Sequence, residues 1–175
     1  KYREEFAYEG IPRWSGQRGA NLVVYGEQGL GDELMFASVL KEVLKDCNQV
    51  ILDCDHRLGP LFQRSFPDIY SFGTRWEKGE KFWEAAGLEQ PTHRAALGTL
   101  TRFYRRDWDS FTPGRGRYLT PDWERRVQVK ALLHHLGEGP KIGIAWTGGT
   151  RITGRKWRCL QMSDLAPLFK LPSCH

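Results

Sequence analysis

Short apolar runs and an amphipathic segment alternate along the first third of the chain. Residues 21–25 form a β-branched run without a charge, which is typical of a buried strand. Residues 33–45 follow a helical period, and residues 49–53 form a second apolar run. The apolar positions of the helical segment are Phe36, Val39, Leu40, Val43 and Leu44. This order predicts a β-loop-α-β unit of a doubly wound parallel sheet.

The pattern continues with shorter elements through the middle of the chain. Residues 57–65 predict a helix with its leucines and Phe62 inward, and residues 69–72 predict a third strand. Residues 82–88 favour a helix closed by Gly87. Residues 92–106 indicate a connecting segment that is partly helical.

A second long helix is predicted over residues 121–136. Pro121 suits the first turn of a helix, and the run G-E-G-P at 137–140 ends the pattern. Its apolar positions are Val127, Leu132, Leu133 and Leu136. His134 and His135 form a pair near its C-terminus, where the helix dipole favours them.

The end of the chain repeats the order found near its beginning. Residues 141–146 predict a buried strand, a glycine-containing basic turn follows, and Ser163 and Asp164 mark a helix start. We therefore expect a lead-in linker at 1–19, a first α/β domain at 20–138 and the truncated start of a second at 139–175.

Composition narrows the class of protein and the partners that are expected. The chain has 175 residues, of which 40% are hydrophobic and 27% charged, as in ordinary globular proteins. It has no apolar run long enough to predict a membrane-spanning helix. The net charge is +5, but acidic residues interrupt most basic clusters, so a nucleic-acid partner is not favoured. Because the chain begins with Lys1, we expect a fragment, a processed chain or a trimmed form.

The four cysteines do not form a C-x-x-C pair, so no metal site is expected. The run Cys54-Asp55-His56 is only a weak indication of a metal ligand set. Reduced thiols in a cytoplasmic protein are the preferred interpretation. Asp53 and Asp55 have the D-x-D spelling of a metal motif, but their place after a strand favours a turn.

The first glycine loop, residues 26–32, departs from the known phosphate-binding patterns. Leu34 stands where the third glycine of the dinucleotide fingerprint belongs, and Asp32 stands where a Walker loop has lysine. Asp32 has two interpretations. It can cap the following helix, or it can be a general base that accepts a proton from a substrate hydroxyl. Stabilisation by the helix terminus makes a carboxylate a weaker base.

The second glycine loop, residues 147–158, is cationic. It combines glycines and threonine hydroxyls with four cations, Arg151, Arg155, Lys156 and Arg158. Backbone amides, hydroxyls and guanidinium groups together suit a diphosphate. A solvated basic turn is the alternative interpretation.

Several short motifs together resemble one known family. They are P-x-W-x-G at 12–16, E-Q-G-L-G-D-E at 27–33 leading into M-F-A, L-G-T-L at 97–100, Y-L-T-P-D at 118–122 and I-G-I-A-W-T-G-G at 142–149. This set is similar to the glycosyltransferase-like domain that follows tetratricopeptide repeats in many bacterial proteins. The Gly31-Asp32 turn also resembles that of the lipopolysaccharide heptosyltransferases.

The resemblance implies a GT-B architecture, in which two Rossmann-like three-layer domains with parallel sheets face each other across a cleft. It implies that Asp32 is the catalytic base, and Lys156 precedes a tryptophan as in the heptosyltransferases. The residues that it places near the donor phosphates are Gly29, Gly31, Thr147, Gly148, Arg155 and Lys156.

The implied reaction is inverting, metal-independent transfer of a hexosyl or heptosyl group from a nucleotide-sugar donor, without a cofactor. The acceptor hydroxyl would belong to a glycan, a lipid or a protein. Tetratricopeptide repeats would precede the domain. The family's second domain continues beyond residue 175, so this chain alone is expected to be poorly active or inactive. A non-catalytic binding or scaffold module with the same fold is the alternative.

Overall fold

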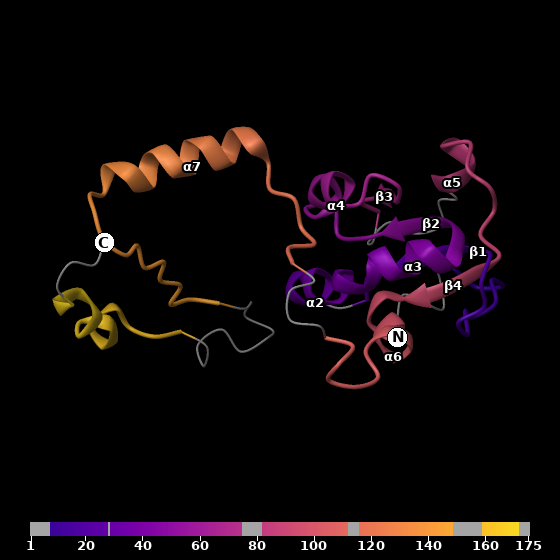
Figure 1. Ribbon diagram of the computed structural model, residues 1–175, viewed down its shortest axis with the longest axis horizontal. Helices are drawn as coiled ribbons and strands as arrows, with labels where there is room; N and C mark the ends of the chain where they lie inside the picture. Colours follow the sequence, from indigo (N-terminus) through magenta and orange to yellow (C-terminus); the bar gives the residue numbers. More distant parts are fainter. Residues whose placement is uncertain (1–7, 28, 75–81, 112–115, 149–158, 172–175) are drawn as a thin grey trace. The chain divides into compact units, whose positions relative to one another are not determined.

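The computed structural model describes residues 8–27, 29–74, 82–111, 116–148 and 159–171. Its contacts divide the chain into two compact units, Lys1–Asp122 and Trp123–His175 (Figure 1). The division falls before the long helix that the sequence pattern assigned to the first domain. That helix therefore belongs to the second unit.

A four-stranded parallel sheet forms the centre of the first unit, in the order β3-β2-β1-β4. The strands are β1 (Ala20–Tyr25), β2 (Cys47–Asp53), β3 (Tyr70–Phe72) and β4 (His93–Ala96). The fold class is thus α/β with a parallel sheet, and the order is consistent with a Rossmann-like domain. The chain builds outward from β1 through β2 to β3, then returns to the other side of β1, so the topological switch point lies between β1 and β4.

Both faces of the sheet are buried. Because side chains alternate along β1, its successive residues pack into different apolar clusters. Leu22 and Val24 join the larger apolar cluster, while Val23 and Tyr25 join the smaller one. Helices from 30–46 and 59–65 contribute to the larger cluster. Trp83, in α5 (Phe82–Ala85), contributes to the smaller cluster. Burial on both sides explains why the β1 run has no polar alternation.

The predicted helix over residues 33–45 is present but is broken. It consists of α2 (Leu30–Phe36), a 3-10 turn η1 (Ala37–Val39) and α3 (Leu40–Asp46). All five expected apolar positions pack against the larger cluster. Spacing of three and four residues suits both helix types, so the apolar pattern could not show the break.

Strand β4 lies in the segment for which only a helical connection was expected. Its sequence, H-R-A-A, contains no β-branched or aromatic apolar residue. Pairing of its backbone with β1 defines it instead. The 3-10 turn η2 (Leu97–Leu100) and helix α6 (Thr101–Tyr104) follow it. The helix α4 (Gly59–Ser65) and strand β3 are close to their predicted positions.

The described part of the lead-in segment packs into the first unit. Tyr8 is 2% exposed and Trp14 is 5% exposed. Arg13 forms an isolated parallel bridge with Arg94, which attaches this segment to the sheet beside β4. Trp14 packs edge-on against Phe103 with ring centroids 4.8 Å apart. Residues 8–19 are therefore part of the domain core and its edge.

The second unit contains α7 (Trp123–His135) and two 3-10 turns, η4 (Met162–Leu165) and η5 (Leu168–Lys170). The strand predicted at 141–146 is absent from the described residues, and Ile142 is 46% exposed there. A strand requires a neighbouring strand, and the described part of this unit contains none. The apolar side chains of α7 are exposed. Pro121 lies before this helix.

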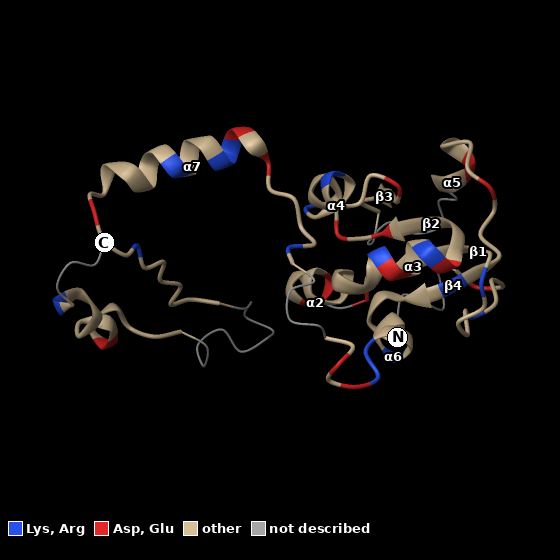
Figure 2. Cartoon of the chain, in the orientation of Figure 1, with Lys and Arg blue, Asp and Glu red and all other residues tan. Residues whose placement is uncertain are grey.

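Charged residues of both signs are interspersed along the described chain (Figure 2). Arg105, for example, pairs with Glu42 at 2.9 Å, and Arg18 pairs with Asp46 at 3.1 Å. Within the described residues, no helix combines the length and apolar character needed to cross a membrane.

Replacing Gly26 by alanine should destabilise the first unit. A Cβ at Gly26 would overlap the carboxylate of Glu33, which is 2% exposed and cannot move aside into solvent. We expect a loss of about 1 to 3 kcal/mol in the free energy of unfolding, measured by urea denaturation. Gly31→Ala is the matched control, because its added Cβ meets open space. Equal stability of Gly26→Ala and wild type would contradict the packing described.

Candidate functional site

The first glycine loop lies at the carboxyl end of β1, where α/β sheets place their ligand sites. Asp32 is not the N-cap of α2. Gly29 holds that position, and Asp32 lies in the first turn. The Asp32 carboxylate accepts a hydrogen bond from the Gly29 backbone amide at 3.0 Å. Its side chain therefore satisfies a backbone amide at the start of the helix. This is the effect predicted for a capping Asp32, but it is exerted from the first turn and not from the N-cap position.

The expected site residues fall into three groups. Gly29, Gly31 and Asp32 lie together at the start of α2. Thr147 and Gly148 lie in the second unit. Arg155 and Lys156 lie outside the described residues. The expected approach of the cationic loop to Asp32 therefore stays a prediction.

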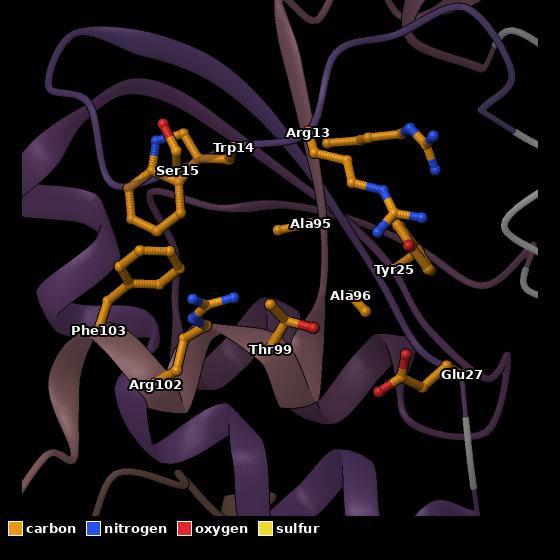
Figure 3. Close-up of a pocket in the computed structure, with 11 residues that line it drawn as sticks. Arg13, Trp14, Ser15, Tyr25, Glu27, Ala95, Ala96, Thr99, Arg102 and Phe103 are labelled. Atoms are coloured by element: carbon orange, nitrogen blue, oxygen red, sulfur yellow. The ribbon is translucent and has the colours of Figure 1, made fainter.

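A cavity of about 350 Å³ opens at the switch point between β1 and β4 (Figure 3). Its lining comes from three places: the lead-in segment, the end of β1, and the stretch from β4 to α6. Its volume suits a small-molecule ligand. Asp32 does not line this cavity, whereas Glu27 of the same loop does.

Arginines dominate the charge of the cavity wall. Among the described residues that line it, Arg13, Arg94 and Arg102 are cationic and Glu27 is anionic. In Figure 3, Arg102 and Glu27 extend into the open space from opposite sides, with Thr99 between them. Sequence analysis missed these residues because β4, which brings Arg94 beside Arg13, has no strand-like pattern. The P-x-W-x-G and L-G-T-L motifs border the cavity and were the available signal.

A separate group of carboxylates is buried at the ends of β1 and β2. Glu33, Asp53 and Asp55 are each at most 2% exposed. Glu33 Oε2 accepts the Asp55 backbone amide at 2.9 Å, and Asp53 accepts the Tyr8 hydroxyl at 2.5 Å. Arg57 donates to both oxygens of Asp55, at 2.9 and 3.0 Å. Each buried carboxylate is thus held by hydrogen bonds, as burial of a charge requires.

Cys54 lies within this acidic group and is fully buried. Its thiol donates to the Phe72 carbonyl at 3.3 Å. Burial first, and then the charges of Glu33 and Asp53, raise the pKa of the Cys54 thiol to about 12. Among the described residues, no group of three or more metal-ligating side chains is placed to hold an ion. Cys54 is therefore a protonated core residue.

The fold and the cavity define an α/β protein with a ligand-sized, arginine-lined opening at its switch point. Protein FlbA of Caulobacter vibrioides is 38% identical to this chain over 144 residues, which cover 77% of this chain and 24% of FlbA. The chain thus spans about a quarter of the length of the curated relative that it matches. No protein-family model and no solved structure matches the chain.

Removing the Tyr8 hydroxyl should destabilise the fold, because the buried Asp53 carboxylate then has one hydrogen-bond donor fewer. In Tyr8→Phe the carboxylate loses one donor while the aromatic packing against Tyr25 is retained. We expect the free energy of unfolding to fall by about 1.5 to 3 kcal/mol in a denaturant titration. Tyr70→Phe, at a side chain that is 48% exposed, should change it by less than about 0.5 kcal/mol. Equal effects of the two changes would contradict the role assigned to Tyr8.

Cys54 should resist alkylation while the protein is folded. A thiol with a pKa of about 12 has roughly one molecule in ten thousand as thiolate at pH 8, against about one in four for an ordinary thiol. Iodoacetamide labelling, followed at each cysteine by peptide mass spectrometry, should therefore be slower by orders of magnitude in the native protein than in urea. Labelling of Cys54 at similar rates in both states would refute this assignment.

Proposed function

We propose that the chain is part of a GT-B glycosyltransferase that transfers a sugar from a nucleotide-sugar donor to an acceptor hydroxyl. The observation that carries the proposal is the ligand-sized cavity at the switch point, directly beside the E-Q-G-L-G-D loop. Open α/β sheets bind their ligands at this place. The motif resemblance supplies the reaction class, and the parallel sheet is compatible with it.

The proposed reaction is a single displacement with inversion. The acceptor oxygen attacks the anomeric carbon, the bond from that carbon to the diphosphate breaks, and the acceptor proton passes to a carboxylate. Asp32 is the proposed proton acceptor. Its side chain is half-buried at the edge of the sheet that holds the cavity. Cations of the loop at 147–158 would balance the charge of the departing diphosphate.

The wider setting is proposed from the same resemblance. Tetratricopeptide repeats would precede this domain. The acceptor would be a glycan, a lipid or a protein. The reaction would take place in the cytoplasm, where nucleotide sugars are available.

A non-catalytic binding module is the second candidate. It is favoured by the hydrogen bond from Gly29 to Asp32, which gives this carboxylate a structural role within the loop. Such a module would retain the cavity and show no turnover. Calorimetry of the full-length protein with a panel of nucleoside diphosphates separates the two, since donor binding is required only for transfer.

Asp32→Asn should abolish most of the transfer or hydrolysis of the donor sugar by the full-length protein. The amide oxygen of asparagine can still accept the Gly29 amide, so the loop and the fold are retained while the base is lost. We expect kcat to fall by about 100- to 10,000-fold with little change in KM. The measurement is release of nucleoside diphosphate from a panel of nucleotide sugars. Asp68→Asn, at an exposed carboxylate away from the loop, should keep wild-type rates. Wild-type rates in Asp32→Asn would remove Asp32 as the base.

A further inference from the structure

We infer that the cavity between β1 and β4 binds the anionic group, a phosphate or a carboxylate, of a small sugar-like molecule. The assignment builds on the proposed function, because it gives a ligand class to the same cavity. It does not require turnover, since a binding module would use the cavity in the same way.

The first support is the sign of the charge that lines the cavity. Among the described residues that line the cavity, three are arginines and one is a glutamate, so cationic side chains outnumber anionic ones. The isolated backbone bridge between Arg13 and Arg94 makes these two residues neighbours at the sheet edge, where Arg94 Nε also donates to the Ile11 carbonyl at 2.7 Å. Arginine side chains suit the planar, two-pronged recognition of phosphate and carboxylate oxygens.

The second support is the setting of Arg102. Its guanidinium extends into the cavity in Figure 3 and lies 5.4 Å from the centroid of the Phe103 ring. Within the described chain it has no carboxylate at salt-bridge distance. Arg105, one turn later, instead pairs with Glu42 at 2.9 Å and also donates to the Ser38 carbonyl. Arg105 therefore has a structural role, while Arg102 is presented to the cavity.

The third support is the uncharged part of the lining. Trp14 and Phe103 pack edge-on, and both rings border the cavity. Aromatic rings provide apolar area for the face of a sugar, and the Thr99 hydroxyl and Glu27 carboxylate can bond its hydroxyls. The Glu27 side chain is held close to the backbone at Gly98, where a Cβ would lie 2.9 Å from its Oε1. Glycine at position 98 thus leaves room for Glu27 at the cavity wall.

The test is calorimetric binding of three sugars that differ at one carbon. Glucose 6-phosphate, glucuronate and uncharged glucose are titrated into the full-length protein without a nucleotide sugar. We expect at least one anionic sugar to bind about tenfold or more tightly than glucose, and Arg102→Gln to remove most of this difference. Binding of the phosphate alone or of the carboxylate alone identifies which anion the cavity recognises.

Arg106→Gln is the matched control, because Arg106 is exposed on the same segment and does not line the cavity. It should bind as wild type does. Equal binding of glucose and the anionic sugars, no binding of either anion, or equal loss in both arginine variants would overturn the inference. The binding assay contains no nucleotide-sugar donor, so its outcome does not depend on sugar transfer. The transfer rate of Asp32→Asn, measured separately, tests only the proposed reaction.

Discussion

The pairing of β1 with a parallel neighbour on each side is the constraint on which the rest of the first unit depends. β2 pairs with six residues of β1, from Ala20 to Tyr25, and β4 pairs with four, from Leu22 to Tyr25. Because β1 is central and covered on both faces, its side chains fix the positions of the helices around it. The same central position makes its carboxyl end the point where the loop and the cavity meet.

Gly26, directly after β1, determines where the buried Glu33 carboxylate can lie. The absence of a side chain there lets the Glu33 carboxylate lie against the end of β1 and accept the Asp55 amide. That bond ties the first turns of α2 to the end of β2 across the sheet edge. The loop geometry, and with it the position of Asp32, thus depends on a buried carboxylate that follows Asp32 directly in the sequence.

Sequence patterns predicted those strands and helices that are buried through their own apolar side chains. The β1 and β2 runs are apolar and the face of the helical segment 30–46 is periodic, so both were found. β4 was missed because the backbone of β1, and not its own side chains, makes it a strand. The strand predicted at 141–146 was wrong because an apolar run becomes a strand only beside a partner. The cavity could not be predicted either, because Arg13 and Arg94 become neighbours only when their segments pair in the sheet.

The carboxyl edge of the sheet is divided into two electrostatic halves. On the β2 side, Glu33, Asp53 and Asp55 are buried and hydrogen-bonded, so an approaching anion meets negative charge where screening by water is weak. On the β4 side the cavity wall carries three arginines. The chain that follows β1 borders both halves, because Glu33 in α2 accepts the Asp55 amide on the β2 side and Glu27 in the first glycine loop lines the cavity. Among the described residues, the β4 side of this edge is therefore more favourable for an anionic ligand than the β2 side, and it lies at the switch point where the strand order reverses.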